Sequence, residues 1–133
     1  MITSYKEYKY YLQADKISLG ISKKRPSLVG NINNDIWKFQ RLLRKTEYFN
    51  NVYKNKVLRL YVLYLKYKLK CKGKKLGYSI PINVAGPGLA LAHAGTIVIN
   101  HKARIGKNCR MHVCVNIGFQ AGTDEAPIIG DNV

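Results

Sequence analysis

The chain has 133 residues, a length that suits one domain or a small domain with a helical extension. It carries 23 Lys and Arg against 7 Asp and Glu, for a formal net charge of +16. This excess favours an anionic partner, such as a coenzyme phosphate, a nucleic acid or an acidic membrane surface. The longest uncharged apolar run in the Tyr-rich part, Leu60 to Leu65, is far shorter than the roughly 20 residues of a membrane-spanning helix.

The cysteines and the N-terminus indicate the compartment. The three cysteines form no CxxC pair, which argues against a disulfide framework and for a reducing compartment. The N-terminal residues are charged from Lys6 onward, so they lack the apolar core of a signal peptide. We therefore expect a soluble, cytoplasmic protein.

Residues 1–76 have the pattern of helices. Ser4 with Glu7 three positions later forms a capping box for a first helix, and Gly20 is its expected stop. A loop with Pro26 and Gly30 follows. Nine of the ten tyrosines lie in this half, where we expect their rings to pack the helices together.

Two further helices are predicted in the same half. Asn34 is expected to cap the second, whose apolar face holds Ile36, Phe39 and Leu43. In the third, apolar residues at spacing four are expected to face the core, with the lysines turned away. These residues are Val57, Tyr61, Leu65 and Leu69.

Residues 77–133 follow a different pattern, rich in Gly, Pro, Val, Ile, Asn and Ala. Aliphatic residues recur there every six positions, which is typical of a parallel β-helix with the repeated side chain pointing inward. Between Ile117 and Ile129 the period is interrupted by a polar stretch that includes Asp124 and Glu125, which we expect to form an outward loop. The repeat residues are Ile99, Ile105, Met111, Ile117 and Ile129, preceded two positions earlier by Ile97, Ala103, Cys109, Val115 and Pro127.

The stretch from Pro81 to Val133 resembles the hexapeptide-repeat acyltransferases, most closely the serine O-acetyltransferase branch and its polysaccharide O-acetyltransferase relatives in bacteria. The resemblance is carried by INVAGPGLALAHAGTIVIN, HKARIGKNCRMHVCVNIG and APIIGDNV. It implies N-terminal α-helices over 1–76 followed by a left-handed parallel β-helix over 77–133. The family continues beyond the roughly three coils counted here. We therefore expect a chain truncated at its C-terminus, with an incomplete coenzyme groove and weak coenzyme binding.

The resemblance also implies a reaction and a site. LAHAGTIVIN matches the family's catalytic histidine pattern and places that role on His93. As general base, His93 would take the proton of an acceptor hydroxyl that attacks the thioester of acetyl-CoA. Gly118 and Phe119 match the coenzyme-lining turn, and a backbone N–H there would stabilise the oxyanion. Acetyl-CoA is thus a co-substrate, no cofactor is expected to be resident, and a homotrimer with sites between its subunits is implied.

Three positions depart from the serine enzymes. Ala92 stands where the family has an aspartate beside the histidine, and Tyr78 where it has the aspartate that orients the imidazole. Ala126 stands where a second histidine serves the amino-acid acceptor. These positions are the acceptor-site candidates. Because they hold no charged group for the ammonium of serine, a sugar hydroxyl suits them better as acceptor.

Other interpretations of His93 remain open. It lies twelve positions before Ile105, in phase with the inward positions, so it is also a candidate for a buried structural histidine. An apolar setting would favour the neutral imidazole, the form that acts as a base. With His101 and His112 it invites a zinc interpretation, but the surrounding charged residues of such sites are missing. We expect no metal, with His101 and His112 in turns or on the surface.

Two function classes compete with acetyl transfer. One is a basic, non-enzymatic binding module. No nucleic-acid motif is present, and the tract KYKLKCKGKK at Lys66–Lys75 suggests at most a weak contact with an anionic membrane surface. The other is an inactive, truncated fragment whose exposed strand edges favour aggregation or docking.

Overall fold

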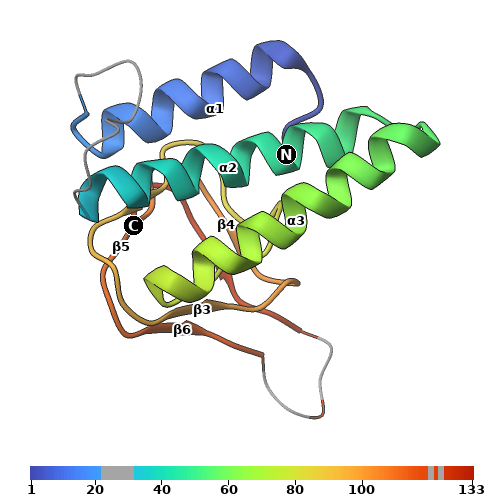
Figure 1. Cartoon of the computed structure of the whole chain (residues 1–133). Coiled ribbons are helices and arrows are strands. Elements are labelled where there is room, and N and C mark those ends of the chain that lie inside the picture. Colours follow the sequence, from blue (N-terminus) through green and yellow to red (C-terminus); the bar gives the residue numbers. More distant parts are fainter. Residues whose placement is uncertain (22–31, 120–121, 123–124) are drawn as a thin grey trace.

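Three helices lie on one side of the molecule and a set of short strands on the other (Figure 1). The computed structural model describes the chain except for residues 22–31, 120–121 and 123–124. The predicted loop residues Pro26 and Gly30, and Asp124 of the predicted outward loop, lie outside the described residues. The helices are α1 (Tyr5–Ser18), α2 (Ile32–Val52) and α3 (Lys56–Leu76).

The first helix begins and ends as predicted. The Ser4 hydroxyl accepts a hydrogen bond from the backbone N–H of Glu7 at 3.2 Å, which satisfies one of the orphan donors of the first turn. The Glu7 carboxylate binds the N–H and hydroxyl of Thr3 instead of the N–H of Ser4, so only half of the capping box forms. Gly20, just after the helix, has a positive φ of 66°, a conformation that glycine adopts at little cost.

The predicted cap of the second helix is wrong. α2 begins at Ile32, so Asn34 lies within its first turn, where backbone N–H groups have no partner inside the helix and Asn is tolerated. The predicted apolar face is confirmed, because Ile36, Phe39 and Leu43 are all buried.

The third helix buries a different stripe from the one predicted. A spacing of four residues drifts around a helix of 3.6 residues per turn, so Val57 and Leu69 do not share a face. Val57 is exposed and Tyr61 half-buried, whereas Leu65 and Leu69 are buried as predicted. The buried stripe of α3 consists of Val62, Leu65, Leu69, Gly73 and Leu76.

The strands are two or three residues long and pair in parallel in three small sheets. The first sheet joins β1 (Tyr78–Ser79), β3 (Ile97–Ile99) and β6 (Val115–Ile117) in that order. The second pairs β2 (Ala90–Leu91) with β5 (Arg110–Met111). The third pairs β4 (Arg104–Ile105) with β7 (Ile128–Ile129).

The predicted left-handed parallel β-helix is therefore wrong as a description of residues 77–133. The described residues form three helices followed by short parallel strands in small sheets, and no closed or left-handed coil is evident among them. One physical reason is the shared core, in which Phe39 and Leu43 of α2 and Leu69 of α3 join the apolar side chains of the strands. The helices thus complete an interior that a β-helix would enclose by itself.

The six-residue period nevertheless marks buried positions. Ile99, Ile105, Met111 and Ile117 are buried, as predicted, and Ile129 is half-buried. The residues two positions before Ile99, Ile105 and Met111 are buried as well. They are Ile97, Ala103 and Cys109.

A buried ionic network joins the helices to the segment before β2. Arg44 of α2 is fully buried, and each of its five N–H donors has an acceptor. The guanidinium donates twice to Asp15, at 2.7 and 3.2 Å, and once to Glu47, at 3.0 Å. It also donates to the carbonyl oxygens of Ala85 and Gly86, at 2.9 and 2.6 Å.

The two carboxylates of this network also bind backbone N–H groups of the same segment. Asp15 accepts hydrogen bonds from the N–H groups of Gly88 and Leu89, at 2.9 and 3.0 Å. Glu47 accepts one from the N–H of Asn83 at 2.8 Å. Every charge of the network is therefore both paired and hydrogen-bonded, the condition under which a buried ion is tolerated.

A neutral side chain extends the contact to the start of β2. Gln40 donates to the carbonyl of Leu89 at 2.7 Å and accepts from the N–H of Leu91 at 3.3 Å. Burial alone lowers the pKa of Arg44, but the neighbouring carboxylates outweigh it and raise that pKa above its ordinary value. Arg44 is thus a permanent cation that fixes residues 83–91 against α1 and α2.

No helix among the described residues combines the length and the apolar character that crossing a bilayer requires.

Removing the central cation should destabilise the fold strongly. Arg44→Met keeps much of the side-chain volume but leaves the carboxylates of Asp15 and Glu47 buried without a cation, which costs about 3–5 kcal/mol. Urea unfolding would measure this loss. The matched control is Lys38→Met, in the partly exposed pair with Asp35 at 3.4 Å, where the loss should stay below about 1 kcal/mol. Equal effects of the two substitutions would contradict the importance of the network.

Candidate functional site

His93 lies in a bent segment between β2 and β3 that is anchored on three sides. The N–H of Ala92 donates to the carbonyl of Met111 at 2.9 Å, and that of Gly95 to the carbonyl of Leu76 at 2.8 Å. The carbonyl of His93 itself accepts the hydroxyl of Tyr78 at 2.8 Å. These bonds hold the backbone of His93 in a single place relative to α3, β1 and β5.

His93 is exposed, so the alternative interpretation of a buried, inward-pointing histidine is wrong. The six-residue phase that buries Ile99 and Ile105 does not extend back to residue 93, because the chain bends between β2 and β3. The result is an anchored backbone that carries a solvent-accessible imidazole.

Tyr78 contacts the backbone of His93 and not its ring. The side chain of Tyr78 is only 5 % exposed, and its hydroxyl donates to the His93 carbonyl. Burial raises the pKa of Tyr78 to about 12. Tyr78 thus lies next to His93, where its hydroxyl binds the backbone of the turn and not the imidazole.

A second histidine lies beside the first. The rings of His93 and His112 have centroids 5.8 Å apart and are tilted by 55°, and His112 is exposed, as predicted. Its proximity to His93 was not foreseen. The two histidines are 19 residues apart, and paired strand residues of the first two sheets are 18 to 20 apart, as in Ile97↔Val115 and Ala90↔Arg110. This spacing is close to three six-residue repeats, so the sequence contained a signal for the proximity of the two histidines.

Within one copy of the chain, the predicted coenzyme-lining residues do not lie near His93. Gly118 and Phe119 are exposed and line a hollow of about 440 Å³ together with His101. They follow β6, whereas His93 precedes β3, and the two strands are parallel. A three-residue strand spans about 10 Å, so one copy of the chain does not bring Gly118 and His93 together.

The other two acceptor-site candidates, Ala92 and Ala126, lie in different parts of the fold. Ala92 is half-buried and adjoins His93 in the anchored turn. Ala126 is half-buried next to Pro127, whose carbonyl accepts the N–H of Arg104 at the start of the β4–β7 pair. Of the three candidates, Tyr78 and Ala92 therefore lie at His93, whereas Ala126 lies two residues before β7 of the third sheet.

The histidines do not assemble into a three-ligand set. Within the described parts of the chain, no three His, Cys, Asp or Glu side chains are grouped closely enough to hold a metal ion. His101 lies in the hollow with Phe119, at the other end of β3 from His93. The arrangement offers the exposed imidazole of His93 on an anchored turn, which suits proton transfer, with the ring of His112 beside it from the segment after β5.

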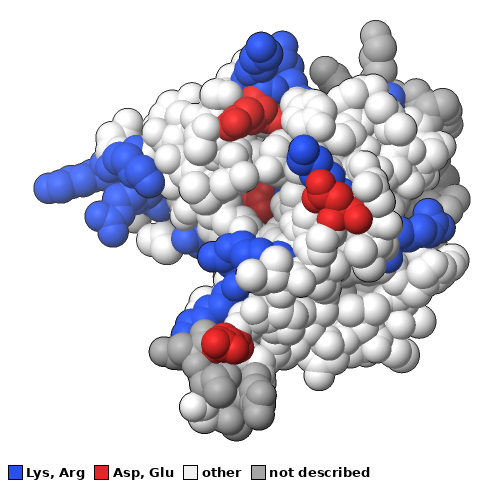
Figure 2. Space-filling model, turned by 180° about the vertical axis from the view of Figure 1, so that it is seen from behind, with Lys and Arg blue, Asp and Glu red and all other residues white. Residues whose placement is uncertain are grey.

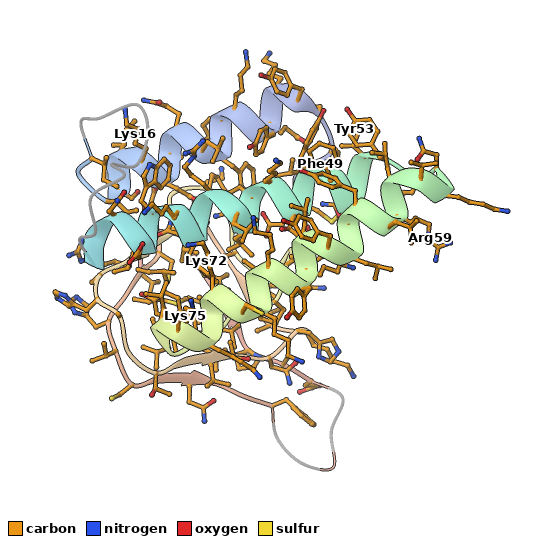
Figure 3. The ribbon with its side chains drawn as sticks, viewed as in Figure 1. Lys16, Phe49, Tyr53, Arg59, Lys72 and Lys75 are labelled. Carbon is orange, nitrogen blue, oxygen red and sulfur yellow. The ribbon has the colours of Figure 1, made fainter. Side chains whose placement is uncertain are left out.

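Aromatic side chains gather at the far end of the helices from this turn. Phe49 and Tyr53 stack at 5.2 Å, and Tyr48 packs against both. Figure 3 shows Phe49 and Tyr53 at the α2 end that leads into α3. This cluster joins helices, as expected for the tyrosines of this half, and contributes nothing to the His93 turn.

Comparisons of the chain with protein-family models, with curated proteins and with solved structures find no match.

Replacing Tyr78 by Phe should loosen the His93 turn in a pH-dependent way. Loss of the hydrogen bond should cost about 1 kcal/mol at pH 8. The pKa of Tyr78 is raised to about 12, whereas an unfolded tyrosine ionises near pH 10. The unfolded state therefore releases its proton first, and the stability advantage of the wild type should shrink as the pH rises from about 10 to 12.

Urea midpoints of both proteins across this pH range would measure that advantage. A constant difference between wild type and Tyr78→Phe up to pH 12 would contradict the assignment of a buried, bonded hydroxyl to Tyr78.

Proposed function

We propose that this chain is an O-acetyltransferase that moves an acetyl group from acetyl-CoA to a hydroxyl acceptor, with His93 as general base. The observation that carries the proposal is the exposed imidazole of His93 on a turn that three hydrogen bonds anchor. Proton transfer needs a base that meets its substrate in a fixed geometry. The pattern LAHAGTIVIN adds the likeness to acyltransferases.

The proposed reaction uses one proton carrier throughout. His93 accepts the hydroxyl proton while the acceptor oxygen attacks the thioester carbonyl carbon. The tetrahedral intermediate then collapses, its C–S bond breaks, and the imidazolium returns the proton to the departing sulfur of coenzyme A. A backbone N–H at Gly118 or Phe119 would stabilise the oxyanion between these steps.

The acceptor is proposed to be a neutral hydroxyl, with a sugar favoured over serine. Ala92 and Tyr78 carry no carboxylate to pair with the ammonium of an amino acid. Asp15 and Glu47 are held by Arg44, and Asp131 binds the N–H of Lys107 at 2.7 Å. These carboxylates are thus engaged away from the His93 turn.

Neighbouring copies of the chain are proposed to complete the site. Gly118 and His93 lie at opposite ends of the β3–β6 pair, and the family likeness implies a homotrimer with shared sites. In such a trimer the Gly118 turn of one copy would face the His93 turn of the next. We place the reaction in the cytoplasm, consistent with three cysteines that are free.

The first test is acetyl transfer by the purified chain, followed as release of coenzyme A thiol with sugar acceptors and with serine. His93→Ala should reduce turnover at least about 100-fold, the scale of a lost general base. Because His93 is exposed, the substitution should change the free energy of unfolding of the protein by less than about 0.5 kcal/mol. The matched control is His112→Ala, which removes the neighbouring ring and should keep most of the activity. Full activity of His93→Ala would refute the proposed base.

The shared site has its own test by complementation. Gly118→Trp fills the hollow that Phe119 and His101 line, and a Cβ at Gly118 meets only the Asn116 side chain, at 3.9 Å. The fold should therefore accept it. Mixed, refolded samples of Gly118→Trp and His93→Ala should regain activity that neither protein has alone. An inactive mixture of two correctly folded variants would contradict sites shared between copies.

A further inference from the structure

The outward face of α3 is an apolar stripe on the opposite side from the core. Along this face, residues at spacings of three and four keep apolar side chains between 53 % and 78 % exposed. The helix therefore has two apolar faces, of which only the one with Leu65 and Leu69 packs on the protein. We call the outward face the outer stripe; it consists of Val57, Leu60, Leu63, Tyr64 and Tyr67.

Basic side chains flank the outer stripe on both sides. At 100° per residue, Lys66 and Lys70 fall on one edge of the stripe and Lys68 and Lys72 on the other. The 21-residue helix contains no Asp or Glu. Figure 3 shows Arg59 at one end of α3 and Lys75 at the other. Its eight basic residues are Lys56, Arg59, Lys66, Lys68, Lys70, Lys72, Lys74 and Lys75.

The face opposite α3 has a different distribution of charge. In Figure 1, α3 lies in front of the strands, and Figure 2 shows the molecule from the opposite side. There, Lys and Arg are scattered among uncharged surface and patches of Asp and Glu. On α3, by contrast, the exposed apolar stripe has basic residues along its edges and the helix carries no acidic residue.

Charge decides among the possible occupants of the outer stripe. A second copy of α3 would bring eight cations against eight, an arrangement that repulsion disfavours. A nucleic acid would pair with the lysines but would leave Leu60 and Leu63 facing phosphates. An anionic bilayer surface complements both parts, since aliphatic and tyrosine side chains enter the headgroup boundary while lysine ammonium groups meet lipid phosphates.

A hollow beside the helix supports the same choice. It has a volume of about 610 Å³, lies between α3 and β1, and is lined in part by Lys66, Lys70 and Lys74. Leu69 and Ile80 form part of its apolar lining. An apolar recess next to a row of ammonium groups matches a molecule with an anionic head and a hydrocarbon tail.

We propose that α3 is a membrane-docking helix that lies in the plane of an anionic bilayer, with the outer stripe in the interface and its lysines on the lipid headgroups. From Val57 to Tyr67 the stripe is about 15 Å long. This inference does not rest on the acetyltransferase proposal, because it concerns binding alone.

The test is co-sedimentation of the full chain with vesicles. Binding should be strong to phosphatidylglycerol–phosphatidylcholine mixtures, at least tenfold weaker to pure phosphatidylcholine, and should fall as salt is raised. Leu60→Glu with Leu63→Glu should weaken binding to anionic vesicles at least tenfold. The matched control is Ile17→Glu, at an equally exposed apolar position of α1, and it should bind as the wild type does.

A second variant reports whether the outer stripe enters the apolar part of the bilayer interface. Leu63→Trp places an indole on the outer stripe, whereas the natural Trp37 is buried, so its emission should shift to the blue on anionic vesicles. The inference is overturned by absent binding at low salt, by equal binding of the double variant, or by an unshifted indole. It is also overturned if light scattering without lipid shows a dimer that the double variant loses, since the stripe would then join two copies.

Discussion

The structure depends on one buried cation, Arg44, and on the two carboxylates that hold it. Its guanidinium binds Asp15 of α1, Glu47 of its own helix and the backbone ahead of β2. A buried ion is costly unless every group around it is satisfied. Here the guanidinium and the two carboxylates have all their hydrogen-bond partners only when α1, α2 and residues 83–91 are in place together. The network therefore makes the packing of the strands conditional on the packing of the helices.

This dependence extends to the candidate site. Gln40 and Asp15 fix the backbone from Gly88 to Leu91, and His93 follows two residues later. Gly77 ends α3 with a φ of 82°, and a Cβ there would lie 2.7 Å from the backbone of Gly95, so only glycine allows the helix end to approach the His93 turn this closely. The exposed imidazole thus stands on a backbone held from both the helical and the strand side.

The apolar periodicity of the sequence correctly predicted which side chains are buried in the repeat and on α2. The inward positions Ile99, Ile105 and Met111 and the core face of α2 are buried as their spacing required. Closure of the strands into a coil was wrongly predicted, because spacing reports which side chains are buried and not what covers them. The Arg44 network was missed because Asp15 and Arg44 are 29 residues apart and resemble ordinary surface charges until the fold is known. The exposure of His93 was missed because a bend interrupts the six-residue phase.

Native-state hydrogen exchange at the amides of Gly88 and Leu89 tests the central claim most directly, because these N–H groups bind the carboxylate of Asp15. If the network joins helices and strands into one unit, both amides should exchange only through global unfolding, with the same opening free energy as core amides of α2. Exchange of Gly88 and Leu89 through a low-energy local opening, while the α2 core stays protected, would contradict the account.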